Sequence, residues 1–396
     1  MPALNQTATQ PQAPPAAIQA DGRLDFVDNL RWVMIVLVVS MHAAVTYSHL
    51  GSWYYMEDPK PQLWETVLFA YYQMGLQAFF MGLLFFFGGY FVPGALVRKG
   101  PVTFLRDRFT RLVLPTLLYM LLIHPLIVYW LLREYRQIAG PFPTLYWQYI
   151  RSFRFLGSSG PMWFALALFI FSLIPTIFYK ARHIQAPMPP ETSLPTNRQV
   201  IGLILLMALC TFLVRVSWPI GTNILNMQLC FFSQYILLFA LGLLAWRRNW
   251  LRRIPYLFGM RWFWLAISVG TLFWLALIVS AVLTHNEQAL FGGATWKSAA
   301  LSLWESFFCL GICLGLIVLF REKFNHKGTF AQVLADNSFS VYLFHAPLLI
   351  AVTLALHPLA VPKIPKFLLA TVLGTVISFS ASHWIFRRVP LLKRIL

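Results

Sequence analysis

Two residues in the first long apolar stretch of the chain have the types and the spacing that chemistry inside a membrane requires. Arg31 and His42 lie in a stretch of otherwise mostly apolar side chains that runs from Leu30 to Val45. Ionisable residues are costly inside a membrane-length helix and usually serve a function. Eleven helical residues return the chain to within about 20° of its starting direction and advance it by about 16 Å. We therefore expect both side chains on one helix face, three turns apart.

The composition of the whole chain indicates a polytopic membrane protein. Of its 396 residues, 59% are hydrophobic and 11% are charged, and a soluble domain carries roughly twice that share of charge. The net charge of +18 does not indicate nucleic-acid binding, because the basic residues occur in short loops between apolar stretches. In such loops they set topology and attract anionic lipid head groups, so membrane lipids are expected partners.

Ten apolar segments are long enough, or nearly so, to cross about 30 Å of hydrocarbon as helices. They lie near residues 30–50, 66–92, 112–132, 161–179, 200–217, 230–246, 261–283, 298–320, 338–356 and 367–386. The sequence therefore predicts an all-α fold, a polytopic bundle of about ten transmembrane helices. If the N-terminus is cytoplasmic, the inner side holds 21 of the 31 Lys and Arg residues and the outer side holds 8. This excess predicts that both termini are cytoplasmic.

The regions outside these segments are short, with one exception. Residues 1–22 are rich in Ala, Pro, Gln and Thr and have no basic or apolar signal-peptide region, so they are expected to form a disordered tail. The membrane domain is predicted to span residues 23–388, followed by a short basic tail at 389–396. The longest connection, residues 133–160, is expected outside as a lid or an interfacial element.

Several kinds of site are not indicated by the sequence. The four cysteines lie inside apolar segments without C-x-x-C spacing, so we interpret them as small core residues and predict no metal site. The sequence has no Walker A motif, no G-x-G-x-x-G after a strand, no H-E-x-x-H and no G-x-S-x-G. These absences disfavour an ATPase, a Rossmann enzyme, a zinc protease and an α/β-hydrolase.

A resemblance to a known family becomes specific once the Arg-x10-His pair is combined with four other stretches. These are Phe86–Tyr90, Phe104–Pro115 with Arg108 and Arg111, Pro161–Phe164 with Trp163, and Ser338–Pro347 with Tyr342 and His345. With these stretches in this order, the chain resembles the acyltransferase-3 family of integral membrane O-acyltransferases over about residues 24–386. Within the family it is most similar to the enzymes that succinylate periplasmic glucans. Gly88 stands where the family usually has Ser, which puts in doubt only a role for a hydroxyl there.

The resemblance implies a membrane enzyme that moves an acetyl or succinyl type of acyl group from cytoplasmic acyl-CoA to a hydroxyl of an envelope carbohydrate or lipid-linked acceptor. The thioester is already activated, so no permanently bound cofactor is expected. A neutral imidazole at His42 would act as general base. Arg31 would hold a phosphate or the thioester end of the donor, and Arg108 and Arg111 would bind the anionic nucleotide part of CoA. The implied location is the cell membrane.

Two further helices carry polar residues that suit such a site. Tyr342 and His345 share a helix face with Ser338, and His345 is expected either to line the cavity, to support His42 or to join helices. A buried Glu305 needs a partner, for which Arg31 and Arg215 are the candidates. Its role would be to orient a catalytic group or to form a plain ion pair.

Two other functions share the polytopic bundle and the intramembrane charges. One is a secondary transporter or acyl-group exporter without chemistry, although Gly and Pro fall mostly at segment ends here rather than within broken helices. The other is a non-catalytic assembly protein, which would have no need of His42. The sequence does not name the acyl group, the acceptor or the oligomeric state.

Overall fold

The computed structural model describes residues 24–179, 193–326, 328–393 and 395, and within these ranges every regular element is a helix. The predicted tail at residues 1–22 lies outside the described residues. The α-helices are α1 (Asp25–Ser48), α2 (Leu63–Arg108), α3 (Leu114–Leu118), α4 (His124–Leu126), α5 (Phe142–Arg151), α6 (Trp163–Ile177), α7 (Asn197–Ser217), α8 (Phe232–Arg247), α9 (Trp250–Arg253), α10 (Tyr256–Leu283), α11 (Gln288–Phe291), α12 (Trp296–Lys323), α13 (Thr329–Leu356), α14 (Lys363–Trp384) and α15 (Pro390–Lys393).

All ten predicted segments are helical, which confirms the all-α polytopic fold. Nine helical stretches of the described chain are long and apolar enough to cross a membrane. One of them, Leu63–Leu131, has 69 residues, whereas a single crossing needs about 20. It is broken at Gly100, whose φ of 72° lies in the left-handed region. This stretch therefore contains two of the predicted segments, 66–92 and 112–132.

Several helices extend beyond the apolar segments. α13 begins at Thr329, nine residues before the predicted start at 338, and α10 begins at Tyr256 rather than 261. Hydropathy marks only the part of a helix that crosses hydrocarbon, while the backbone hydrogen bonds continue into the polar turns. The predicted C-terminal tail contains the short helix α15.

The connections predicted outside contact one another at one end of the bundle. Four contacts join the five connections. Arg136 Nη2 donates to Tyr54 O (3.2 Å), and Lys363 Nζ lies 3.1 Å from Glu57 Oε1. Asn226 Nδ2 donates to Gly160 O (2.7 Å), and Ile220 N donates to Phe291 O (2.7 Å). Elements predicted at the inner side also meet, since Asn29 Nδ2 donates to Phe324 O (2.7 Å). The grouping of loops agrees with the predicted alternation of crossings.

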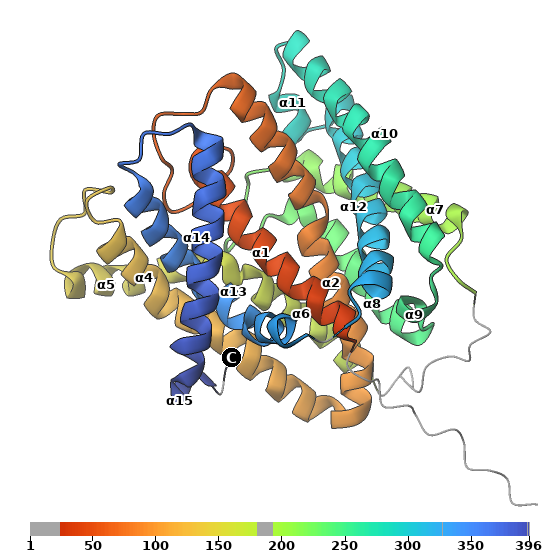
Figure 1. Ribbon diagram of the computed structural model, residues 1–396, viewed down its shortest axis with the longest axis horizontal. Helices are drawn as coiled ribbons and strands as arrows, with labels where there is room; N and C mark the ends of the chain where they lie inside the picture. The colour runs from red at the N-terminus through yellow and green to blue at the C-terminus, as the bar shows by residue number, and fades with distance from the viewer. Residues whose placement is uncertain (1–23, 180–192, 327, 394, 396) are drawn as a thin grey trace, which may run out of the picture.

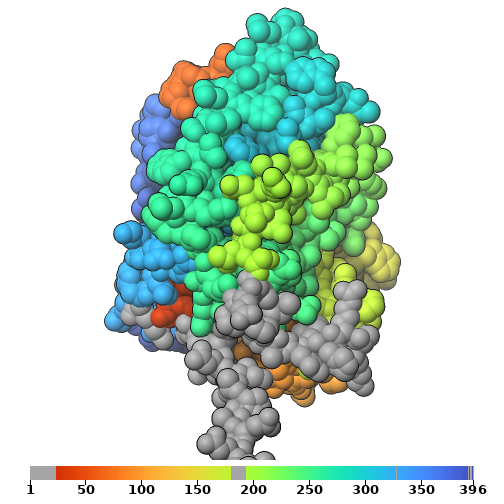
Figure 2. All heavy atoms as spheres, turned by 90° about the vertical axis from the view of Figure 1, so that its right-hand side faces the viewer, coloured from red at the N-terminus to blue at the C-terminus, as the bar shows by residue number. Residues whose placement is uncertain are grey.

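α1 lies in the middle of the bundle, where it contacts α2, α12, α13 and α14 (Figure 1). α7 and α10 lie at its periphery and cover the face seen in Figure 2. Their exposed side chains include Leu205, Leu209, Leu213, Leu272 and Val279. An apolar surface of this kind suits contact with lipid tails, whereas Ser40, Thr46 and Ser48 of α1 are buried inside the bundle.

Glycines bring the backbones of α2 and α8 together. A Cβ atom at Gly89 would meet the carbonyl oxygen of Phe239, and one at Gly242 would meet the carbonyl oxygen of Phe86. Small residues allow such close approach between membrane helices, where packing drives association. This contact fixes the wall of α2 that carries the polar residues described next.

Candidate active site

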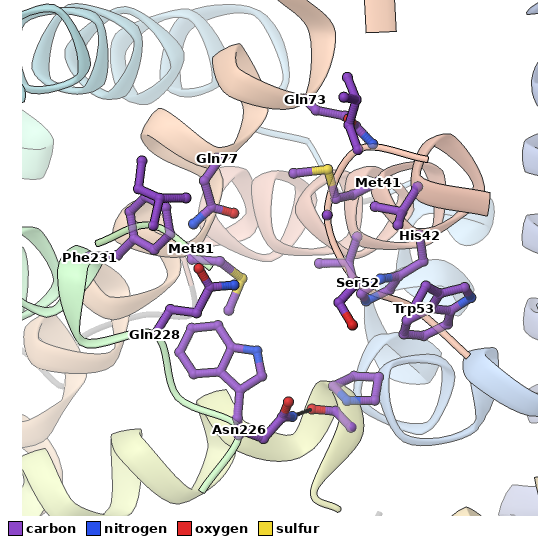
Figure 3. A pocket seen from close by; sticks show the side chains of 18 of the residues that line it. Met41, His42, Ser52, Trp53, Gln73, Gln77, Met81, Asn226, Gln228 and Phe231 are labelled. Carbon is purple, nitrogen blue, oxygen red and sulfur yellow. Dashed lines mark hydrogen bonds between the residues drawn. The ribbon is translucent and has the colours of Figure 1, made fainter. Parts of the chain in front are cut away.

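A cavity of about 470 Å³ lies between the outer halves of the helices and the connections at the predicted outer end. Figure 3 shows His42 and Trp53 on one side of it, and Gln77, Gln228 and Phe231 on the other. Exposed residues such as Ser52 and Gln228 line it, so the cavity opens to the surface at that end. Its size is in the range of small-molecule sites in proteins.

His42 lines this cavity from α1. Its imidazole stacks on Trp53 with ring centroids 3.8 Å apart and lies beside the ring of His345 at 5.3 Å. Among the described residues, no hydrogen-bond partner occupies either ring nitrogen of His42. A positioned imidazole with a free nitrogen in a cavity can accept a proton from a bound hydroxyl.

His345 is completely buried on α13, behind His42. Its Nδ1 lies 2.9 Å from the carbonyl oxygen of Tyr342 and 3.2 Å from that of Val341. A carbonyl only accepts, so Nδ1 carries the hydrogen and Nε2 is a bare acceptor. Nε2 is buried and has no partner within the described chain. His345 is not among the described residues that line the cavity, and its ring lies beside that of His42, so a support for His42 stays a prediction.

Trp53 belongs to the connection between α1 and α2, which sequence reasoning did not include in the site. The buried carboxylate of Glu57 anchors this connection, with Oε1 3.1 Å from Lys363 Nζ and 2.7 Å from Lys366 Nζ. Both lysines lie in the first turn of α14. The run Trp-Tyr-Tyr directly after the His42 helix is the signal in the sequence that could have indicated this wall.

Trp163, Glu305 and Tyr342 also line the cavity, as residues predicted for the site. Tyr342 OH donates to Pro161 O and so holds the segment that leads into α6. Glu305 pairs with Arg215, and both side chains are buried. Of the two partners proposed for Glu305, Arg215 is confirmed.

Arg31, Arg108 and Arg111 lie elsewhere, at the predicted inner end. The Arg31 side chain is 53% exposed and lies 3.6 Å from Asp28. The Arg108 guanidinium lies over the ring of Phe104, 5.2 Å from its centroid. The positive charges of Arg31 and Arg111 act on it electrostatically. The three arginines lie at the same end of the bundle, and none of them is among the described residues that line the cavity.

Four amide side chains on the cavity wall were not predicted: Gln73, Gln77, Asn226 and Gln228. Gln77 Nε2 donates to Tyr235 OH (3.0 Å), which orients one of them. Gln73 and Gln77 are spaced one helical turn apart in an apolar helix, a signal that the sequence does contain. Together with the faces of Trp53 and Trp163, these amides give the cavity donors, acceptors and flat apolar surfaces.

Two tyrosines in the outer connections remain neutral phenols. Burial raises the pKa of Tyr54, and it raises that of Tyr149 to about 12. Neither is therefore a general base near neutral pH. Within the described ranges, no group of three or more His, Cys, Asp or Glu residues is arranged to hold a metal ion.

A protein-family model described as an acyltransferase domain matches residues 24–383. Comparisons with curated proteins and with solved structures gave no match.

Proposed function

The chain belongs to the acyltransferase-3 family, and on that premise we propose that it is an O-acyltransferase that uses cytoplasmic acyl-CoA and acylates a hydroxyl of an envelope carbohydrate. It is an acyltransferase and a multi-pass integral membrane protein. The proposal adds the donor, an acyl group of acetyl or succinyl type, the acceptor and a location in the cell membrane.

The observation that carries the proposal is His42, whose ring nitrogens have no hydrogen-bond partner among the described residues and which lies on the wall of a cavity open at the predicted outer end. The acceptor hydroxyl enters the cavity and gives its proton to His42 while its oxygen attacks the thioester carbon. The tetrahedral intermediate then collapses, the C–S bond breaks, and the leaving thiolate takes the proton from His42. The products are an ester and free CoA thiol.

The donor is assigned to the opposite end of α1. Arg31, Arg108 and Arg111 present positive charge where the nucleotide and phosphates of CoA would arrive from the cytoplasm. Arg31 and His42 are separated by about 16 Å of helix. The extended arm of CoA must therefore pass between the helices to bring its thioester to His42.

Mass spectrometry of envelope glycans tests this function directly. Cells that express the protein should contain acylated glycans that are absent from cells without it. His42→Ala should lower this acylation by about 10²-fold or more, the range of general acid–base catalysis. His285→Ala is the matched control, because His285 is exposed at the same end and does not line the cavity. If His42→Ala leaves acylation unchanged at equal protein abundance, the general-base role is wrong, and an exporter or an assembly protein remains as the function.

The donor assignment makes a separate prediction. Arg108→Gln combined with Arg111→Gln should raise the apparent KM for acyl-CoA more than it lowers kcat, because these contacts are made in ground and transition states alike. Donor binding by the wild type should weaken as salt rises, since contacts near solvent are screened. Enzyme in lipid nanodiscs, titrated with acetyl-CoA and succinyl-CoA, gives both measurements. A double variant that loses affinity for the acceptor instead would show that these arginines set the membrane topology and do not bind the donor.

A further inference from the structure

We propose that His124 is a hydrogen-bond donor that binds an oxygen atom of the acceptor sugar, with its tautomer fixed by Tyr54 and Tyr119. The inference rests on the proposed function, since it assigns a residue to the acceptor. His124 belongs to α4, between the π-helical turns Tyr119–Ile123 and Ile127–Leu131. It lines the same cavity as His42. π-Helical turns often occur at functional sites, because they redirect side chains.

Two hydrogen bonds connect the three residues. His124 Nδ1 lies 2.8 Å from Tyr54 OH, and Tyr54 OH lies 3.1 Å from Tyr119 OH. Three arrangements of donation are possible along this chain, because a hydroxyl oxygen can accept more than one hydrogen bond. In the first, Tyr119 donates to Tyr54 and Tyr54 donates to Nδ1 of His124. In the second, Nδ1 donates to Tyr54, Tyr54 donates to Tyr119, and the hydroxyl hydrogen of Tyr119 needs a further acceptor. In the third, Nδ1 and Tyr119 both donate to Tyr54, and the hydroxyl hydrogen of Tyr54 needs a further acceptor.

The burial of Tyr119 and Tyr54 decides between these arrangements. Both side chains are buried, and Tyr54 is the hydrogen-bond partner of Tyr119 within the described chain. The second and third arrangements would each leave a buried hydroxyl hydrogen without an acceptor, which is costly. The first gives both hydroxyl groups an acceptor and places the hydrogen of the neutral imidazole on Nε2. Nε2 is then a donor without a partner among the described residues, on a side chain that lines the cavity.

The position of His124 separates its task from that of His42. Along the cavity wall, Trp53 and Tyr54 lie between the two imidazoles, with ring centroids 5.1 Å apart for Trp53 and Tyr54 and 5.4 Å apart for Tyr54 and His124. His124 therefore contacts a different part of the acceptor from the hydroxyl that reacts at His42. Arg136 lies beside it on the cavity wall and donates to Tyr54 O. The part of the cavity formed by His124 and Arg136 therefore offers hydrogen-bond donors, which can bind a sugar hydroxyl or ring oxygen through its lone pair.

Nitrogen-15 NMR of histidine-labelled protein in nanodiscs tests the tautomer without any substrate. The His124 signals, identified by their loss in His124→Phe, should show hydrogen on Nε2 and none on Nδ1. Tyr119→Phe removes the hydroxyl that fixes the direction, so both tautomers should appear. Tyr146→Phe is the matched control, because the Tyr146 hydroxyl donates to the backbone oxygen of Leu121 instead. Hydrogen on Nδ1 in the wild type would overturn the proposal.

Kinetics tests the contact with the acceptor. The probe is the glycan fraction of cells that lack the protein, with whichever of radiolabelled acetyl-CoA or succinyl-CoA the wild type uses. His124→Phe should raise the apparent KM for the glycan about ten-fold or more, the effect of losing one hydrogen bond to a buried group. The apparent KM for the donor should stay within two-fold. His124→Gln, which retains an N–H donor, should restore most of the acceptor affinity.

The outcomes separate this inference from the function on which it rests. If the wild type transfers acyl groups and His124→Phe leaves the glycan KM within two-fold, the role of His124 is wrong and the proposed function stands. If the wild type transfers none from either donor, the proposed function fails, and the acceptor assignment fails with it. The NMR measurement still decides where the proton of His124 lies.

Discussion

At the scale of single residues, the deepest charges beside the cavity are those of Arg215 and Glu305. Arg215 is fully buried, Glu305 is 5% exposed, and Arg215 Nη1 also donates to Ser302 Oγ (3.4 Å). Removing one partner of a buried ion pair leaves an uncompensated charge, whereas removing both charges is much less harmful. The pair therefore constrains the fold even though one of its members lines the cavity.

Arg215→Gln should accordingly destabilise the protein by about 3–5 kcal/mol, and the double change Arg215→Gln with Glu305→Gln should recover most of this loss. Thermal unfolding of purified protein in detergent measures both. Lys99→Gln removes one member of the exposed pair Lys99–Asp107 and serves as the control, with little expected change. A single variant as stable as the wild type would show that Glu305 does not depend on Arg215.

The residues of the cavity divide by whether they lie in helices or in loops. His42 and Glu305 could be chosen from the sequence, because ionisable residues in apolar helices stand out. Trp163 and Tyr342 were chosen because their stretches resemble those of the family. Trp53 and its neighbours could not be chosen in this way, because no periodicity predicts how a connection folds over helix ends. Helical spacing also did not show which end of the bundle a side chain reaches. Arg31 and His42 share a helix, but their side chains lie toward opposite ends of the bundle.

At the scale of secondary-structure elements, the contact between α2 and α8 places Gln73 and Gln77 on the cavity wall. Gly89 and Gly242 allow it, since a Cβ at either position would meet the backbone of the other helix. The order of the long apolar helices followed from hydropathy. This close contact did not, because a glycine in an apolar helix does not reveal which neighbour approaches it.

Gly89→Ala should weaken this contact and destabilise the protein by about 1–3 kcal/mol, the usual cost of overpacking. Gly75→Ala is the matched change in the same helix, because its Cβ would lie 3.7 Å from the ring of Phe308, an ordinary contact. The yield of monodisperse protein and its melting temperature report the difference. If the two variants have the same yield and melting temperature, α2 and α8 can move apart without a loss of stability.

At the scale of the whole molecule, topology decides which substrate reaches which end. The cavity opens among the connections predicted outside, and the arginines lie at the other end. An excess of Lys and Arg on one side sets orientation. The same excess that orients the chain therefore also places positive charge where an anionic donor is expected to arrive.

Cysteine labelling tests this orientation. In a chain whose four native cysteines are replaced by alanine, Gln148→Cys should react with an impermeant thiol reagent in intact spheroplasts. Lys323→Cys should react only after the membrane is opened. Both positions are exposed in the structure, so access depends on the side of the membrane alone. The reverse pattern would contradict both the topology and the donor-inside, acceptor-outside mechanism.

The anchoring of Glu57 has a consequence for the order in which the enzyme is made. Lys363 and Lys366, which hold this carboxylate, are 306 and 309 residues further along the chain. During synthesis, helix α1 and the loop that carries Trp53 emerge long before α14. Until α14 is inserted, Glu57 has neither lysine, and the loop that carries Trp53 lacks this anchor. This part of the cavity wall is therefore completed only after α14 has been made, and a chain that stops before α14 holds His42 beside a loop without its lysine anchor.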